Sequence, residues 1–317
     1  MNRISIALIL NQALIVVLAF LLSLVEGGFE KSFALDLFVR LGECVVYFVS
    51  FVVPVILFNK MNKNAEREIY EPVESEKASP FKSFIILGFS LGAITLAAYL
   101  NYYIVNAFLD YSDFTNEYFW SVELDHTYQM VIYFAYSAII PAFVEELLFR
   151  GTVCRVLTVY GKGTAVVASA ALFALMHANI EQLIYTFIAG LLLGWIYVET
   201  KNLAFPILLH FLNNGISSLG DILYEAADTK IYNTYTSYSE MIMWAIMLLS
   251  LVVLLVGILK KGSVIGKLKM KPDENGNEVA PLTVSERVSG FFSLGTVLFT
   301  LYSIFMMVYY IYLSTKL

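Results

Sequence analysis

Charged residues are scarce in this chain: Lys, Arg, Asp and Glu make up only 15% of its 317 residues, whereas 59% are hydrophobic. A soluble domain carries about 25% charged residues, so the composition excludes an ordinary soluble protein. Only two cysteines are present, which excludes a disulfide-rich scaffold, and no basic patch points to a nucleic-acid partner. With a mean hydropathy of +0.73, the chain is expected to be an all-α, polytopic membrane protein surrounded by lipid.

Long hydrophobic runs recur along the whole chain. They predict a transmembrane helical bundle with about eight or nine spanning helices. The first run is not followed by a small-residue cleavage site, so we expect it to be a retained helix rather than a signal peptide. The runs cover residues 4–25, 41–58, 83–107, 128–150, 163–178, 182–198, 203–219, 241–259 and 289–314.

Basic residues are divided unevenly between alternate loops. When the amino terminus is placed in the cytoplasm, most of the 20 Lys and Arg residues fall on the inner side, and the 108–127 loop is acidic without a basic residue. The positive-inside rule therefore predicts a multi-pass cell-membrane protein with a cytoplasmic amino terminus. The absence of an organellar transit signal favours a bacterial plasma membrane.

These features divide the chain into three expected parts. Membrane helices and an external loop occupy 1–127, a core with membrane-embedded ionisable residues occupies 128–219, and further helices with a cytoplasmic linker occupy 220–317. Within the core, Gly190 and Gly194 have the small-xxx-small spacing that predicts close helix packing.

Three ionisable residues interrupt one of the most hydrophobic stretches. Glu145, Glu146 and Arg150 lie within one and a half helical turns, and a charge at the centre of a membrane helix costs about 2.5–3.5 kcal/mol on insertion scales. Glu146 and Arg150 are four residues apart, so we expect them to form a buried structural ion pair on one helix face. Glu145 is rotated by about 100° and is left free for chemistry. Pro141 lacks an N–H and predicts a break in the helix just before these residues.

A histidine lies at a matching depth on the next apolar segment. The Gly161-Lys162-Gly163 sequence predicts a turn, with Glu145 17 residues before Lys162 and His177 15 residues after it. At about 1.5 Å per residue these side chains lie about 25 and 22 Å from the turn. We therefore expect Glu145 and His177 to be level with each other across a helical hairpin.

A second histidine and an asparagine follow on a third segment. His210 and Asn214 are four residues apart and share a helix face. His210 lies only about 13 Å beyond Lys201 at the predicted inner edge. For the three segments to meet, the tip of the 150–162 hairpin must project about 10 Å into the cytoplasm, so we expect the site to open toward the inner face.

The ordered motifs Glu-Glu-xxx-Arg, Phe-xxx-His and His-xxx-Asn on successive membrane helices resemble the CPBP family. That family includes the type II CAAX prenyl endopeptidases and bacteriocin-processing and immunity proteins. The resemblance covers about 128–219, and it implies an intramembrane endopeptidase. In this family the first glutamate and first histidine activate water, while the second histidine and the asparagine hold the oxyanion. The motif positions, all intact here, are Glu145, Glu146, Arg150, Phe173, His177, His210 and Asn214.

The chemistry of peptide hydrolysis fits these residue types. Glu145 can take a proton from water, and a well-placed general base is worth about 10²–10⁴-fold in rate. His177 would orient that water and pass a proton to the leaving amine. His210 and Asn214 would donate to the oxyanion, where the loss of one donor costs about 10²–10³-fold. No serine or cysteine nucleophile is needed, and the expected substrate is a peptide or lipidated peptide cut near the cytoplasmic face.

Three alternatives stay open. The first is a catalytic zinc ion held by Glu145, His177 and His210, although the sequence has no His-Glu-xx-His motif and we expect no cofactor. The second is a non-catalytic membrane scaffold or immunity protein on the same fold. The third is a proton-coupled transporter, against which stand the lack of an inverted repeat and the restriction of embedded ionisable residues to a few neighbouring helices.

Overall fold

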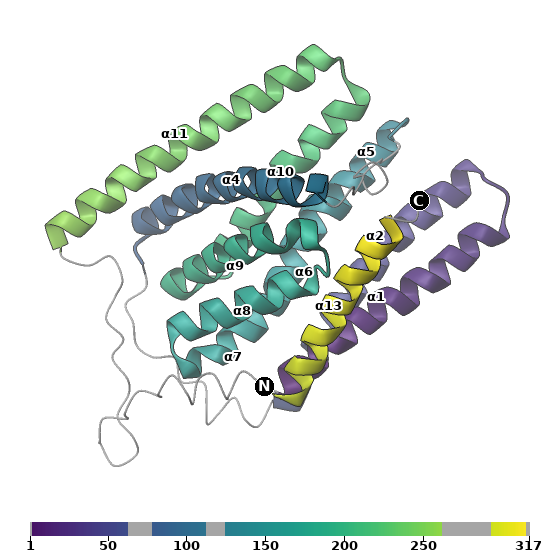
Figure 1. Cartoon of the computed structure of the whole chain (residues 1–317), viewed down its shortest axis with the longest axis horizontal. Helices are drawn as coiled ribbons and strands as arrows, with labels where there is room; N and C mark the ends of the chain where they lie inside the picture. The colour runs from purple at the N-terminus through teal and green to yellow at the C-terminus, as the bar shows by residue number, and fades with distance from the viewer. Residues whose placement is uncertain (1, 63–77, 112–123, 262–292, 315–317) are drawn as a thin grey trace.

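The computed structural model describes residues 2–62, 78–111, 124–261 and 293–314, and the regular structure of these ranges is entirely helical (Figure 1). This confirms the predicted all-α, polytopic bundle. The loop at 108–127 and the linker near 260–288, on which part of the predicted orientation depends, lie mostly outside the described residues. The helices are α1 (Asn2–Gly28), α2 (Phe33–Asn62), α4 (Pro80–Tyr111), α5 (Thr127–Phe134), α6 (Ile140–Leu148), α7 (Arg155–Leu157), α8 (Lys162–Met176), α9 (Ile180–Thr200), α10 (Ala204–Ala226), α11 (Thr229–Lys261) and α13 (Leu294–Ser314).

Each predicted hydrophobic run falls on a helical stretch, but the stretches differ in their capacity to span a membrane. Among the described residues, six helical stretches are long and apolar enough to cross a bilayer. The helices α8 and α13 are apolar but shorter, and α10 carries His210 and several other polar residues. The six stretches are Arg3–Gly28, Phe33–Met61, Pro80–Val105, Thr127–Tyr160, Ile180–Thr200 and Thr229–Val256.

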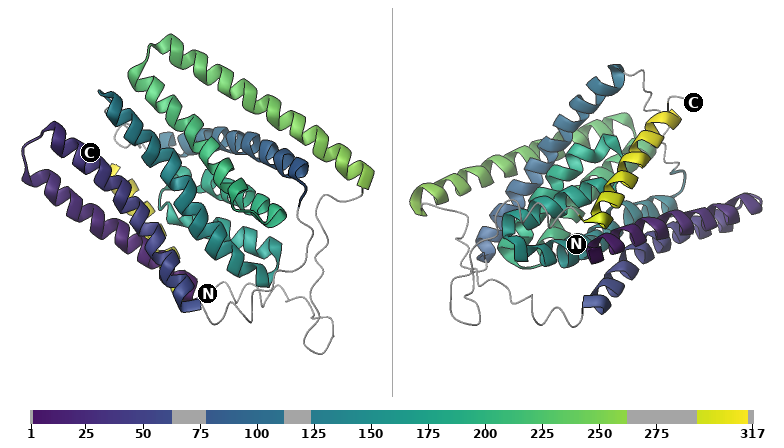
Figure 2. Two further views of the ribbon diagram at one scale, coloured as in Figure 1. Left: turned by 180° about the vertical axis from the view of Figure 1, so that it is seen from behind. Right: turned by 60° about the horizontal axis from the view of Figure 1, so that its bottom comes forward.

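The helices form a central group flanked by two peripheral ones. The hairpin α1–α2 packs with α13 on one side of the molecule, and α4 packs with α11 on the other (Figures 1 and 2). Between them, α5 to α10 contact both groups: α6 lies against α2, and α9 and α10 lie against α4. Many large apolar side chains of α1, α2 and α11 are exposed, as expected for helices that face lipid. The segment predicted as the core, 128–219, therefore forms the centre of the bundle.

The helices α8 and α9 pack closely against each other. A Cβ atom on Gly190 would lie 2.9 Å from the Cα of Ala170, and one on Gly194 would lie 3.2 Å from Cγ1 of Val166. Without side chains at these two glycines the backbones approach each other, which is the reason for the small-xxx-small spacing. The predicted close packing is thus present.

Replacing Gly190 by alanine is expected to destabilise the protein by about 1–3 kcal/mol, since overpacking forces the two backbones apart. Gly163→Ala is a matched control, because a Cβ there meets nothing within 4 Å. Thermal unfolding in detergent should show a lowered midpoint for Gly190→Ala alone. Equal midpoints for the two variants would contradict this account of the α8–α9 contact.

The helix that carries the two glutamates is irregular on both sides of them. A π-helical turn, η2 (Ala135–Ile139), precedes α6, and a second one, η3 (Phe149–Cys154), follows it. The chain then continues through α7 into a short 3₁₀ turn, η4 (Thr158–Tyr160). Pro141, near the start of α6, has no N–H for the carbonyl of Ser137, so the predicted break coincides with the first π turn. Such π turns occur frequently at functional sites.

The predicted projection of the 150–162 hairpin by about 10 Å into the cytoplasm is not matched by any projection past the ends of the neighbouring helices α4 and α9. Lys162, at the start of α8, lies 3.8 Å from Glu199 at the end of α9, and Lys82 of α4 lies 2.8 Å from the same carboxylate. The tip is therefore level with the ends of α4 and α9. The depth estimate assumed a regular α-helical rise, whereas η3 and η4 depart from it.

Candidate active site

The predicted ion pair, which joins α6 to the following π turn η3, is present and fully buried. Arg150 Nη1 lies 2.7 Å from Glu146 Oε1, and both side chains are 0% exposed. Arg150 Nη2 also donates to the carbonyl of Gly190 at 3.1 Å, and its guanidinium lies 4.6 Å from the ring centroid of Phe173. The arginine thus ties α6 to α8 and α9, and the missing side chain at Gly190 gives it access to the backbone.

Glu146 does more than neutralise the arginine. His210 Nδ1, on α10, lies 2.8 Å from the same oxygen, Glu146 Oε1. A carboxylate only accepts hydrogen bonds, so Nδ1 is the donor and carries the proton. Glu146 therefore fixes the tautomer and orientation of His210 and leaves its Nε2 as the nitrogen available for chemistry.

Glu145 is held by a residue from outside the predicted core. The hydroxyl of Tyr47, on α2, donates to Glu145 Oε1. The Tyr47 ring is itself fixed by Phe51, with centroids 4.9 Å apart, and by Tyr136 at 5.6 Å. One carboxylate oxygen of Glu145 is thereby assigned to a structural contact.

The second oxygen of Glu145 has no hydrogen-bond partner. Glu145 is 3% exposed, and its Oε2 is buried without a protein donor. The nearest ionisable atom recorded for it is Nε2 of His210, at 4.0 Å. This distance is too long for a direct hydrogen bond, but one water molecule at about 2.8 Å from each atom would bridge it.

His177 lies at the end of α8, where the chain turns sharply into α9. Its Nδ1 bonds the carbonyl of Phe173 at 2.8 Å, which leaves Nε2 without an assigned partner. The next residue, Ala178, has a positive φ of 49°, a conformation that costs free energy in residues other than glycine. Phe173 packs edge-on against His177 at 4.8 Å and His210 at 6.1 Å, so one ring positions both imidazoles.

Asn214 is oriented by two hydrogen bonds. Its Nδ2 donates to the carbonyl of Ser137 at 3.0 Å, and its Oδ1 accepts from Asn213 Nδ2 at 3.0 Å. The Ser137 carbonyl is the one that Pro141 cannot bond. An amide nitrogen carries two protons, so the second N–H of Asn214 is still available.

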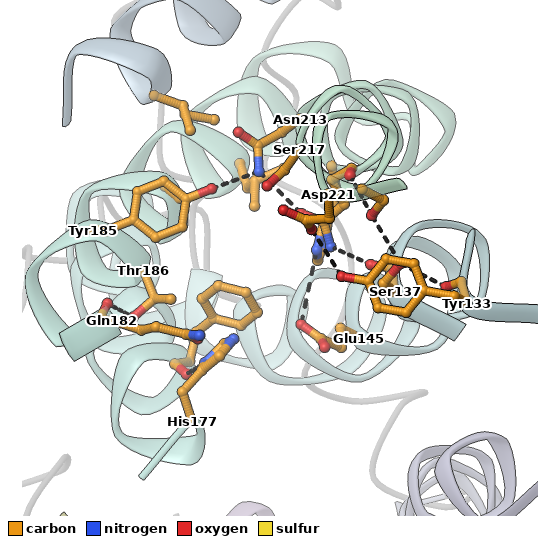
Figure 3. A pocket seen from close by; sticks show the side chains of 17 residues that line it. Tyr133, Ser137, Glu145, His177, Gln182, Tyr185, Thr186, Asn213, Ser217 and Asp221 are labelled. Carbon is orange, nitrogen blue, oxygen red and sulfur yellow. Dashed lines mark hydrogen bonds and ion pairs between the residues drawn. The ribbon is translucent and has the colours of Figure 1, made fainter. Parts of the chain in front are cut away.

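The four residues predicted to be catalytic share one cavity of about 280 Å³ (Figure 3). Glu145, His177, His210 and Asn214 all lie on its wall, contributed by α6, α8 and α10, whereas Glu146 and Arg150 lie behind it. Asn213 also reaches the wall and donates to the hydroxyl of Tyr185 on α9 at 2.6 Å. Side chains from all three sequence motifs therefore line the same cavity.

The cavity does not open at the end of the bundle predicted to be cytoplasmic. Its wall runs from the buried Glu145 and His210 to Ser217 and Asp221 near the end of α10, which are exposed. This mouth points away from the end at which Lys82 and Lys162 bind Glu199. The expectation of an opening at that basic end is therefore not supported, because it rested on the projecting hairpin.

The residues proposed for a zinc site do not fit one in this structure. In the ranges that the structure covers, no three His, Cys, Asp or Glu side chains lie close enough to hold a metal ion. Glu145 Oε2 and His210 Nε2 are adjacent, but the third proposed ligand, His177, does not complete a group with them.

Sequence reasoning missed three contributors to the site. Tyr47 lies in an apolar run where a tyrosine is an ordinary packing residue, and nothing around it marks a role. Asn213 lies outside the three motifs, yet its side chain reaches α9. Asp221, which accepts a hydrogen bond from Tyr133 of α5 at 2.8 Å, lies just past the predicted core boundary. An ionisable residue close to a membrane span is a sequence signal for a functional site, and of these three residues only Asp221 gave that signal.

Comparisons with known proteins agree with the motifs. Residues 127–216 match a family model described as type II CAAX prenyl endopeptidase Rce1-like. The membrane-embedded CAAX protease MroQ of Staphylococcus aureus (strain USA300) is 32% identical over 106 residues, which cover 31% of this chain and 43% of that relative. The match thus spans less than half of the relative's length, and no solved structure is significantly similar. The resemblance to the CPBP family that the motifs indicated is thus confirmed for the central segment, residues 127–216.

Proposed function

We propose that this protein is an intramembrane endopeptidase in which Glu145 acts as the general base on a water molecule. The observation that carries the proposal is the state of its carboxylate: one oxygen is held by Tyr47, and the other is buried, unpartnered and on the cavity wall. A water molecule between Glu145 Oε2 and His210 Nε2 would be placed for attack on a carbonyl carbon. Glu145 takes the proton of that water as the new C–O bond forms.

The developing negative charge requires donors on the same wall. Asn214 offers its second N–H, and its orientation is fixed by Ser137 and Asn213. His210 donates from Nε2 only when both of its ring nitrogens carry protons, because Nδ1 already donates to Glu146. We therefore assign the oxyanion to His210 and Asn214 and give Glu146 a positioning role.

His177 completes the reaction as a proton carrier. Its Nδ1 is committed to the Phe173 carbonyl, so Nε2 is the atom that faces the reaction. When the C–N bond breaks, the leaving amine needs the proton that Glu145 removed from water. His177 would deliver it, and the products would be a carboxylate terminus and an amine terminus.

The scissile bond would lie in the buried half of the cavity, with the peptide entering at the Asp221 end. Under the predicted orientation, with the amino terminus in the cytoplasm, this mouth faces outward. The peptide would therefore enter from the outer face, and not from the cytoplasmic face expected from the sequence.

A comparison of cells tests the proposal. Cells that carry the wild type and cells that carry Glu145→Gln should differ by one or more membrane-associated precursor peptides that accumulate uncut in the variant. Identical peptide profiles and an identical cellular phenotype would instead favour a non-catalytic scaffold or immunity protein on this fold. Activity of the purified protein that survives a chelator would separate the glutamate mechanism from the zinc alternative.

Replacing Tyr47 by phenylalanine is expected to lower kcat by about tenfold with little change in KM. The hydroxyl donates to a buried carboxylate, and hydrogen bonds to charged groups are worth about 1.5–3 kcal/mol. Phenylalanine keeps the ring contacts with Phe51 and Tyr136. Steady-state kinetics on a peptide substrate would measure the effect.

Tyr136→Phe is the matched control for this experiment. Tyr136 belongs to the same aromatic group, but no hydrogen bond joins its hydroxyl to Glu145. Its loss should leave kcat within about twofold, the spread usual for a substitution of about 0.5 kcal/mol. An equal loss in both variants would show that ring packing, rather than the hydroxyl, governs the effect.

A further inference from the structure

The mouth of the cavity carries a carboxylate with no cationic partner. Asp221 is exposed, lines the cavity and accepts a hydrogen bond from the Tyr133 hydroxyl at 2.8 Å. None of the ion pairs found among the described residues includes it. Figure 3 shows Asp221 and Tyr133 on the same side of the cavity as Ser137. A charged group is thus held at the entrance by a single neutral neighbour.

The rest of the wall supplies no positive side chain. The 17 lining residues include Glu145 and Asp221 but no lysine or arginine, and Arg150 is fully buried behind the wall. The other ionisable side chains on the wall are two histidines, His177 and His210, and two tyrosines, Tyr133 and Tyr185. The mouth of the cavity thus presents a carboxylate with no lysine or arginine on the wall to offset it, which favours a cationic ligand there.

The wall is also poorly suited to a long apolar chain. Only four of its 17 residues are apolar: Ile94, Phe173, Ala189 and Leu193. The others present hydroxyl, amide, imidazole or carboxylate groups, and burying hydrocarbon against a group that lacks a protein partner, such as Glu145 Oε2, costs free energy. A peptide backbone, in contrast, offers hydrogen-bonding groups at every residue.

We propose that the cavity selects a polar peptide segment with a lysine or arginine side chain that pairs with Asp221, and that it does not hold a prenyl chain. This inference rests on the proposed function, since it names the substrate class of the same site. Asp221 follows His210 by 11 residues on α10, which corresponds to about 16 Å along the helix. An extended peptide covers that distance in about five residues, and the reach of a lysine side chain shortens it. The basic residue is therefore expected about three to six positions from the cut.

Cleavage profiling with a proteome-derived peptide library tests the proposal. The purified full-length protein in detergent is incubated with the library, and the new amino termini are read by mass spectrometry. Wild-type cuts should be enriched roughly two- to fivefold in Lys or Arg within that window, the range for a solvent-accessible ion pair. Asp221→Asn should lose the enrichment, and Asp221→Lys should replace it with a preference for Asp or Glu.

Two variants control for side effects of the substitution. Tyr133→Phe keeps the Asp221 carboxylate and should keep the enrichment. That result would show that the charge of Asp221, rather than its contact with Tyr133, selects the basic residue of the substrate. Asp228→Asn removes a nearby exposed acid that is not on the cavity wall, and it too should keep the enrichment. A farnesylated cysteine peptide should be cut no faster than its unmodified counterpart.

The outcomes separate this proposal from the proposed function. Cuts by the wild type that show no basic enrichment, or an enrichment unchanged in Asp221→Asn, overturn the proposal while leaving the peptidase intact. A requirement for the farnesyl group also overturns it. If wild type and Glu145→Gln give the same cuts, or none, the peptidase assignment itself fails.

Discussion

Replacing Glu145 by glutamine is expected to reduce the turnover number of the purified protein by about 10²–10⁴-fold, the value of a well-placed general base. Glutamine has the shape of glutamate, and its carbonyl oxygen can still accept from the Tyr47 hydroxyl. The substitution therefore removes the base and leaves the contact between α2 and α6 in place. Initial rates on a peptide substrate, with the variant and the wild type at equal concentration, measure the loss.

The same variant should fold normally. Glu145 Oε2 is buried without a donor, so replacing the charge with a neutral amide relieves a desolvated group rather than breaking a pair. We expect an unfolding midpoint in detergent equal to or above that of the wild type. A rate within a fewfold of the wild-type rate would refute the assignment of Glu145, whatever the stability of the variant.

Replacing Arg150 by methionine is expected to destabilise the protein by about 3–5 kcal/mol, because it leaves the Glu146 carboxylate in the protein interior without its cation. The variant also loses the bond to the Gly190 carbonyl, which joins α6 to α9. The midpoint of thermal unfolding in detergent should fall well below that of the wild type. Cleavage activity should fall with it, since His210 is oriented by the same carboxylate.

A double substitution distinguishes the lost charge pair from lost packing. Glu146→Gln combined with Arg150→Met removes both charges and keeps an acceptor for His210 Nδ1, so much of the stability should return. Arg155→Met, five residues further on, should lower the unfolding midpoint far less than Arg150→Met does, because Arg155 is exposed to solvent. A double variant as unstable as Arg150→Met would mean that packing around the guanidinium, not the buried charge, dominates.

Most of the fold follows from composition. Apolar runs of about twenty residues in a chain with few charges leave a helical bundle as the available structure, because backbone groups in lipid must bond within their own segment. The limits of individual spans follow less well. The region 203–219 was predicted to span the membrane as a hydrophobic run. The helix found there, α10, carries the polar residues of the candidate site on one face, and it is not among the six stretches apolar enough to cross a membrane.

The residues of the three motifs in the candidate site were predictable from local spacing, but the residues that reach it from elsewhere in the chain were not. Spacing placed Glu146 and Arg150 on one face and His210 and Asn214 on another, since both pairs depend on local helix geometry. Tyr47 was not predictable, because its bond to Glu145 joins residues 98 positions apart and leaves no local pattern. The end of the bundle at which the cavity opens was also predicted wrongly. The depths of Glu145 and His210 were calculated from the rise of a regular α-helix, whereas the chain contains a π turn at Phe149–Cys154.

The π turn at Ala135–Ile139 sets the rotational phase of α6 relative to α5. If the same residues were wound as a regular α-helix, the extra residue that the π turn accommodates would turn the two segments by about 100° with respect to each other. Every motif letter would survive such a change, yet the glutamate pair and the Tyr133 side of the entrance would no longer face the same space. A sequence in which this turn is regular α-helix would thus keep the motifs and lose the site, and the motif letters alone cannot tell the two apart.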